Sequence, residues 1–398
     1  MKVNNFFWDA LGATRVTRAR RKLIAHGDAH APYTDHVGAL AKELHPSVTH
    51  LRVTDVEDVS PTARRITFEA ISPDVLPPFQ AGQYVSLDLQ IEGTVTTRPY
   101  SISSAPYVAR RGADSRLQIT VRHTDAPEVF AARWLYEEVR VGDEFSAHLP
   151  FGDFFYEPLR DARRVVALAG GSGITPFVSM AAEIAHGSLD CDLTILYGSV
   201  STTDIVLKED LEALAASCER VRVVNVISGD EKGLPDGYEQ GFISAELIRK
   251  YTQGSPSDGG TSYFVCGPAV MYTHVLAELA KLEVPERRIR TEVFGSPRKA
   301  GHAKEQGFEL TVKRGLEETV IPARSTEPLA VALERAGIPN HTRCRSGACG
   351  YCRARLLTGE VYVPEQGDGR RLADKQNGYV HACSVWPLSD CTLEVPIV

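Results

Sequence analysis

The chain has 398 residues, of which 43% are hydrophobic and 24% are charged, and its formal net charge is −7. This length exceeds what one hydrophobic core usually organises, so it predicts two or three domains. The acidic balance gives no sign of a nucleic-acid-binding protein. The sequence has no apolar run long enough to cross a membrane and no secretory signal pattern at its start, so we expect a cytoplasmic protein.

Residues 1–46 form a basic N-terminal extension with seven Lys and Arg against four Asp and Glu. The segment is predicted either as a solvated helix, which we favour, or as a docking surface for an acidic partner. Residues 47–158 then alternate short β-rich runs with turn signals, which predicts an antiparallel barrel or sandwich.

Residues 159–298 change to strands that alternate with helices, and this order predicts a doubly wound α/β domain with a parallel sheet. The polar stretch 299–306 has no hydrophobic period and is expected to be a linker. Residues 307–398 form the last predicted domain, which contains an amphipathic helix, a cysteine-rich loop and a final strand.

The loop CRSGACGYC begins a C-x4-C-x2-C pattern, and a fourth cysteine follows after thirty further residues. This is the plant-type [2Fe–2S] spacing, and the small residues between the ligands let backbone N–H groups approach the sulfides. A zinc site or free thiols are the alternatives, but zinc sites more often pair two close cysteine elements and the sequence has no second one. The predicted metal ligands are Cys344, Cys349, Cys352 and Cys383.

A cluster that carries single electrons needs a flavin to convert the hydride of a pyridine nucleotide. RPYSISS, residues 98–104, offers a guanidinium for a phosphate, an aromatic ring and hydroxyls, although alone it is equally an ordinary strand. FQAGQYVSL lies upstream of it. AGGSGITP, residues 169–176, is a glycine-rich turn that opens a helix whose N-terminus attracts a pyrophosphate, and FVCGP ends a later strand.

With these motifs, residues 48–298 resemble the ferredoxin-NADP reductase family in its form fused to a ferredoxin. Residues 307–398 resemble a plant-type ferredoxin domain. The resemblance implies an antiparallel β-barrel for the flavin, an α/β domain for the nicotinamide nucleotide and a β-grasp domain of the α+β class for the cluster.

The resemblance also implies roles for individual residues. Arg98 would bind the flavin phosphate and Tyr100 would lie against the isoalloxazine ring. Ser101, Cys266 and Glu292 would be the catalytic residues, with positioning rather than acid–base chemistry as the mechanism. The other residues implied to bind cofactors are Pro99, Gly82, Gln83, Tyr84, Gly170, Gly171, Gly173, Thr175, Pro176, Gly267, Pro268 and Phe294.

Two choices of cofactor stay open. FAD members of the family usually carry G-x-x-S before a W-L pair, whereas PEVFAARWL places Val129 and Ala132 there. FMN is therefore an alternative to FAD, which we favour because a helix N-terminus can bind phosphate through its backbone. After the second α/β strand, LYGSVSTTD offers Ser199 and Ser201 but no cation before Lys208, so we favour NADH over NADPH.

The sequence thus predicts an NAD(P)H-dependent reductase that passes single electrons through a flavin and the cluster to a separate acceptor protein. The acceptor could be an oxygenase component, a hybrid-cluster protein or another metalloenzyme. A redox-sensing interaction module and a self-sufficient reductase of a quinone or flavin are the alternatives. The arginines around the cluster loop predict an acceptor that is acidic at its docking site; they are Arg343, Arg345, Arg353 and Arg355.

Overall fold

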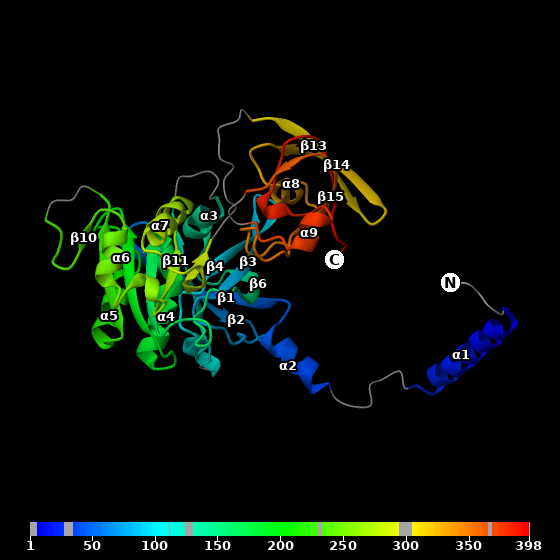
Figure 1. Ribbon diagram of the computed structural model, residues 1–398, viewed down its shortest axis with the longest axis horizontal. Coiled ribbons are helices and arrows are strands. Elements are labelled where there is room, and N and C mark those ends of the chain that lie inside the picture. The colour runs from blue at the N-terminus through cyan, green and yellow to red at the C-terminus, as the bar shows by residue number, and fades with distance from the viewer. Residues whose placement is uncertain are drawn as a thin grey trace. The chain divides into compact units, whose positions relative to one another are not determined.

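The computed structural model describes residues 6–27, 35–110, 112–123, 130–229, 233–293, 305–364 and 368–397 (Figure 1). Two compact units make up the chain, Met1–Leu44 and His45–Val398. The first contains α1 (Phe6–His26) and α2 (His36–Leu44), and the described side chains of α1 are exposed. Among the described residues, no helix is both long and apolar enough to span a membrane.

The second unit begins with a six-stranded antiparallel sheet in the order β4-β3-β6-β1-β2-β5. A bridge between Ile102 and Ile119 joins the end of β4 to β5, which closes the sheet. Alternate side chains such as Leu87 and Phe68 fill the interior. The predicted antiparallel barrel is therefore confirmed. Its elements are β1 (Thr49–Ser60), β2 (Ala63–Ala70), β3 (Tyr84–Ile91), β4 (Thr94–Ser101), β5 (Leu117–Arg122), α3 (Phe130–Glu138) and β6 (Glu144–Phe151).

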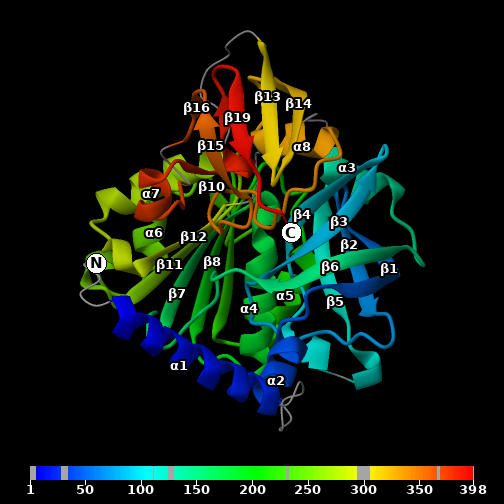
Figure 2. The same cartoon turned by 90° about the vertical axis from the view of Figure 1, so that its right-hand side faces the viewer.

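A second sheet of six parallel strands follows in the order β10-β9-β8-β7-β11-β12. Helices cover both of its faces, because α4 and α5 contribute to one apolar core and α6 and α7 to the other. This is the predicted doubly wound domain, and β7, β8 and β11 run side by side in Figure 2. Its elements are β7 (Arg164–Gly170), α4 (Thr175–His186), β8 (Asp192–Ser199), α5 (Lys208–Ser217), β9 (Val221–Ile227), β10 (Glu239–Gln240), α6 (Ala245–Tyr251), β11 (Thr261–Cys266), α7 (Ala269–Lys281) and β12 (Ile289–Glu292).

The last domain is a mixed five-stranded sheet in the order β14-β13-β19-β15-β17, drawn from yellow to red in Figure 1. Strands β13 and β19 pair in parallel, and α8 packs its Leu329 and Leu333 into the core of this sheet. A helix across a mixed sheet is the predicted β-grasp arrangement. Its elements are β13 (Gly307–Arg314), β14 (Glu317–Arg324), α8 (Leu329–Arg335), β15 (Arg353–Thr358), β16 (Val361–Tyr362), α9 (Leu372–Gln376), β17 (Tyr379–His381), β18 (Trp386–Pro387) and β19 (Cys391–Glu394).

Candidate functional site

The four predicted metal ligands meet in the last domain. The Cys344 thiol contacts those of Cys349 and Cys383, and the Cys383 thiol in turn contacts that of Cys352. Backbone N–H groups of Ser346 and Cys349 point at Cys344 Sγ, at 3.5 and 3.4 Å. Four thiols with N–H groups directed at sulfur fit a [2Fe–2S] cluster.

The backbone of the cluster loop makes this convergence possible. Gly347 and Gly350 have φ angles of +80° and +77°, a region in which a side chain would be strained. His381 holds the loop through a contact between its Nδ1 and the Gly347 carbonyl. Among the described residues no group of three or more His, Cys, Asp and Glu side chains is arranged around a single ion. A two-iron cluster divides its ligands between two ions, two on each, and so does not require such a group.

Arg98 places a half-buried cation on β4. Its Nη1 donates to the Thr97 carbonyl at 3.0 Å, and the guanidinium lies 5.2 Å from the ring centre of Phe130, the first residue of α3. Burial lowers the pKa of Arg98 to about 10, so the side chain stays charged at neutral pH. A cation beside a helix start is suited to a flavin phosphate. Ala132 lies in the first turn of α3, and Val129 falls outside the described residues.

The three predicted catalytic residues are brought together from the barrel and the α/β domain. Ser101 ends β4 and its Oγ donates to Glu292 Oε2 at 3.3 Å. Glu292 ends β12 and lies opposite Cys266, the last residue of β11. Burial raises the pKa of the Glu292 carboxyl and of the Cys266 thiol, and the charge of Glu292 raises that of Cys266 further. Phe294, the remaining residue predicted here, lies outside the described residues.

Tyr84 lies between this group and the cluster loop. Burial raises the pKa of its hydroxyl, and the nearby groups of Cys344, Cys349 and Glu292 raise it further. The ring packs 6.0 Å from that of Phe151. The upstream motif supports this arrangement, because Gln83 Nε2 donates to the Gly152 carbonyl at 3.1 Å.

Gly82, in the same motif, has φ +104°, and a Cβ on it would lie 2.0 Å from the Phe154 carbonyl oxygen. The chain therefore needs glycine at this position both for its backbone conformation and for the close approach of the loop after β6.

The glycine-rich turn and the FVCGP segment touch where the strand order of the parallel sheet reverses. A Cβ on Gly173 would lie 2.3 Å from the Cys266 carbonyl oxygen, and one on Gly170 would lie 3.2 Å from Pro268 Cδ. Open α/β sheets bind ligands at this position, outside the carboxyl ends of the strands. The remaining predicted residues of the turn are Gly171, Thr175 and Pro176, which lead into α4, and Gly267, which follows β11.

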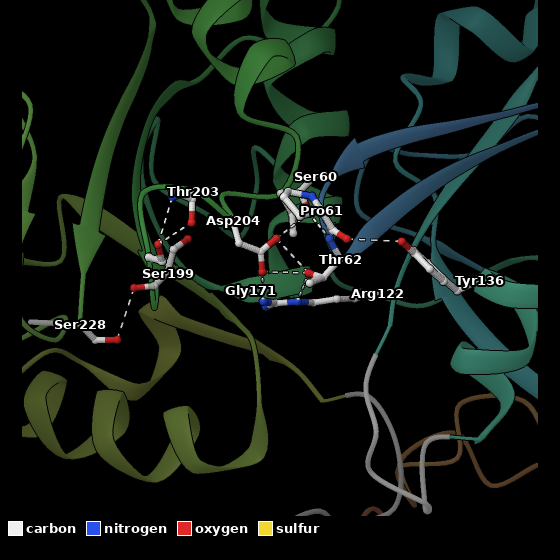
Figure 3. Close-up of polar contacts among 12 residues, drawn as sticks. Ser60, Pro61, Thr62, Arg122, Tyr136, Gly171, Ser199, Thr203, Asp204 and Ser228 are labelled. Carbon is white, nitrogen blue, oxygen red and sulfur yellow. Dashed lines mark hydrogen bonds and ion pairs between the residues drawn. The ribbon is translucent and has the colours of Figure 1, made fainter. Parts of the chain in front are cut away.

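Sequence reasoning missed an arginine and an aspartate at this turn (Figure 3). Arg122 ends β5, and its Nη1 lies 2.9 Å from where a Cβ on Gly171 would be. Its Nη2 pairs with Asp204 Oδ2 at 2.5 Å. Asp204 also accepts from Ser60 Oγ at 2.7 Å and from Thr62 Oγ1 at 2.9 Å. The only sign of this in the sequence was Arg122 itself, the last but one residue of RLQITVRH. Its location gives the glycine turn a guanidinium suited to a pyrophosphate.

The segment after β8 is polar. Ser228 Oγ donates to the Ser199 carbonyl at 3.3 Å, and Ser201 Oγ lies 2.8 Å from Thr203 Oγ1. Lys208, the first cation after this strand, lies 3.8 Å from Glu212 on α5. Hydroxyls at this position suit the ribose of NADH.

The arginines around the cluster loop do not form one outward surface, which corrects the sequence-based expectation. Arg345 is 5% exposed and contacts β4 of the barrel. Arg343 lies over the rings of Phe151 and Tyr351, at 5.7 and 5.2 Å. The local sequence could not show this, because it does not reveal which surface the loop packs against.

Arg353 and Arg355 are exposed. Arg353 pairs with Asp374 at 2.6 Å.

Three family descriptions match the chain in succession. They are "Oxidoreductase FAD-binding domain" over residues 50–156, "Oxidoreductase NAD-binding domain" over 167–276 and "2Fe-2S iron-sulfur cluster binding domain" over 313–388. The chain is 27% identical over 347 residues to the glycine betaine monooxygenase reductase subunit of Chromohalobacter salexigens, covering 83% of this chain and 91% of that protein.

Two further comparisons agree with that result. The chain is 28% identical to the NADH oxidoreductase HCR of Escherichia coli over 318 residues, which cover 79% of this chain and 89% of that protein. The solved structure of phthalate dioxygenase reductase has the same fold, with a TM-score of 0.63 and 19% identity over 88% of this chain and 98% of that one.

The fold and the three domains define a flavoprotein reductase of the ferredoxin-NADP reductase type. The chain carries a [2Fe–2S] cluster binding domain after the two oxidoreductase domains. It is an NAD(P)H-dependent oxidoreductase whose cofactors are FAD, NADH and a [2Fe–2S] cluster, and it passes electrons to a separate acceptor protein. The match to an FAD-binding domain supports FAD, the flavin that the sequence favoured.

Proposed function

We propose that this chain is the reductase component of an oxygenase, and that its acceptor is the oxygenase component. The observation that carries the proposal is the similarity, over 83% of the chain, to a protein named as a monooxygenase reductase subunit. When bound, FAD would supply the conversion of a hydride from NADH into single electrons, and the cluster would supply their one-electron transport.

The residues of the chain would position these groups. Arg98 would hold the flavin phosphate beside the start of α3, and Ser101 and Glu292 would meet at the reacting edge of the ring system. The turn around Gly171, with Arg122 beside it, would hold the pyrophosphate of NADH. The raised pKa of Cys266 keeps its thiol neutral near the nicotinamide, where a thiolate would repel negative charge.

The exit surface would lie around Cys349, the exposed ligand of the cluster. Arg355 on β15 and Arg371 at the start of α9 are exposed near this end of the ferredoxin domain, and β17 links the two elements. We infer that these arginines meet carboxylates of the acceptor, in place of the half-buried Arg343 and the buried Arg345.

The acceptor is tested by mixing the purified reductase, loaded with FAD and cluster, with NADH and an isolated oxygenase component. Reduction of the oxygenase by NADH only in the presence of the reductase supports the proposal. A reductase that reduces its own cluster with NADH but reduces no oxygenase component would contradict it.

The docking surface is tested separately with Arg355→Glu and with Arg163→Glu as the control. Arg163 is an exposed arginine at the entrance to β7, on the α/β domain. We expect Arg355→Glu to slow acceptor reduction at low salt about tenfold, with a smaller effect at high salt, because charge reversal mainly changes the association rate. Equal rates for both variants would show that these arginines do not face the acceptor.

A further inference from the structure

Arg345 connects the cluster loop to the strand that carries the flavin motif. Its side chain is 6% exposed, its Nε donates to the Thr97 carbonyl at 2.5 Å, and its Nη2 donates to Thr96 Oγ1 at 3.1 Å. Thr96 and Thr97 directly precede Arg98 on β4. Arg345 directly follows the cluster ligand Cys344, so its side chain connects the cluster loop to the flavin strand.

Glu334 on α8 completes the connection. Its Oε1 accepts a hydrogen bond from Arg345 Nη2, and its Oε2 accepts one from Thr96 Oγ1 at 3.1 Å. The same Oε2 lies 4.0 Å from Arg98 Nη1, and the Glu334 side chain is 10% exposed. One carboxylate of the ferredoxin domain therefore joins Arg345 to the barrel and borders the arginine predicted to bind the flavin phosphate.

The charges of Arg345 and Glu334 affect how a phosphate could bind beside Arg98. A buried carboxylate beside Arg98 would repel a phosphate that binds there, because attraction and repulsion between charges are strong where water is excluded. Arg345 supplies the compensating positive charge. Removing one member of a buried ion pair leaves the other uncompensated, which costs far more than removing both.

We propose that Arg345 and Glu334 form a clip that couples the two cofactor sites of this chain. The clip seats the ferredoxin domain on β4, and it keeps the carboxylate of Glu334 neutralised beside Arg98 so that the flavin phosphate can bind. Both are positioning residues, because they act through Arg98 and through the placement of the cluster loop. The inference rests on the passage of electrons from the flavin to the cluster within one chain.

The first test measures FAD affinity, which does not depend on turnover. The dissociation constant of FAD is measured by fluorescence for the whole protein and for Arg345→Met, Glu334→Gln and the double variant. Arg335→Met is the matched control, because Arg335 follows Glu334 on α8 but contacts Pro322 and Glu327 within its own domain.

We expect Arg345→Met to weaken FAD binding about tenfold, as the loss of compensation for one buried charge predicts. Glu334→Gln and the double variant should bind FAD as tightly as the parent protein or more tightly, because neither leaves an uncompensated carboxylate beside the phosphate. Arg335→Met should leave the affinity unchanged. If Arg345→Met loses FAD and the double variant loses it equally, the charge argument is wrong.

The second test separates flavin reduction from cluster reduction. Each FAD-saturated variant is mixed rapidly with NADH, and flavin bleaching is compared with the spin-resonance signal of the reduced cluster. All three clip variants should bleach within about twofold of the parent, whereas their clusters should become reduced at least tenfold more slowly. The oxidised cluster should keep its visible circular dichroism spectrum, which shows that its ligands are intact.

The outcomes distinguish the clip from the proposed function. If the clip variants reduce their clusters at the parent rate, the positioning role is overturned while the electron path stands. If NADH bleaches the flavin of the parent protein but never reduces its cluster, the electron path itself is wrong. If Arg345→Met does not fold, Glu334→Gln and the double variant still test the slower cluster reduction.

Discussion

The barrel meets its two neighbours in different ways. Toward the α/β domain, Phe154 and Ala81 belong to the same apolar core as Phe177 of α4. Toward the ferredoxin domain, the described contacts are directional polar bonds and ring contacts, and the apolar core of that domain consists only of its own residues. A shared core fixes two domains permanently, whereas polar docking specifies one orientation with little shared apolar surface.

The ion pairs near the two interfaces differ in how far their side chains are exposed to solvent. Arg122 and Asp204, which join the barrel to the α/β domain, are 33% and 18% exposed. Arg345 and Glu334, which pair with each other within the ferredoxin domain and both bond to β4 of the barrel, are 6% and 10% exposed. The partly exposed pair adds to an interface that apolar packing already holds, while the buried pair bonds to β4 where the two domains have separate apolar cores.

The largest expected effect is the loss of acceptor reduction when the cluster is removed from the ferredoxin domain. Cys349→Ser removes one thiolate ligand, so the variant should lose the cluster and reduce no acceptor protein. NADH should still bleach its flavin at the parent rate, because the cores of the domains are separate. Absorbance and spin resonance after mixing with NADH measure both effects, and loss of flavin reduction as well would show that the cluster supports the fold of the barrel.

The shared core is tested next with Phe154→Ala. The Phe154 ring packs 5.3 Å from Phe264 and 5.8 Å from Phe177, and the side chain is 3% exposed. Truncating a buried phenylalanine costs about 3–5 kcal/mol in the free energy of unfolding. Urea unfolding should show this loss for the barrel and the α/β domain together. If only one of the two domains is destabilised, their core is not shared.

Asp204→Asn should have a smaller effect on the same interface. The variant keeps the size of the side chain but weakens the bonds to Arg122, Ser60 and Thr62, so we expect about 1–2 kcal/mol lower stability. Because Arg122 is then freed toward the glycine turn, NADH affinity should be retained or increased. Calorimetric titration checks the affinity, and a large loss of NADH binding would mean that Asp204 itself contacts the nucleotide.

The smallest effect depends on pH and involves Glu292, which joins the α/β domain to Ser101 of the barrel. Burial raises its pKa above the ordinary value of 4.5, so the folded protein holds this proton more tightly than the unfolded chain. That contribution to stability is complete below pH 4.5 and is lost as the pH rises through the folded pKa.

Glu292→Gln cannot ionise. Relative to the parent protein it should therefore be more stable at pH 8 than at pH 5. Urea unfolding at both values measures the difference, and a constant difference would show that Glu292 does not titrate on unfolding in this range.

The sequence predicted those parts of the site that depend on local spacing. Three cluster ligands lie within nine residues, so one short loop brings them to the same metal site. The predicted flavin-binding groups from Arg98 to Ser101 lie at consecutive positions of one strand. The glycine turn follows a strand of a parallel sheet, where the position of a ligand is a rule of the architecture.

Contacts between distant segments could not be predicted in this way. Arg345 and Thr97 are 248 residues apart, and Arg122 and Asp204 are 82 apart. The charge of Arg345 alone predicted exposure, because an arginine is rarely buried without a partner, and its contacts with Thr96 and Thr97 of the barrel became visible only in the folded structure.

The separate core of the ferredoxin domain has a practical consequence for building hybrid reductases. A foreign [2Fe–2S] domain grafted after the α/β domain would fold by itself, but it would bring its own residue to the position of Glu334. A graft that carries both the glutamate and the arginine should pass electrons from the flavin of its host to a new acceptor. A graft that carries the glutamate alone should weaken flavin binding in its host.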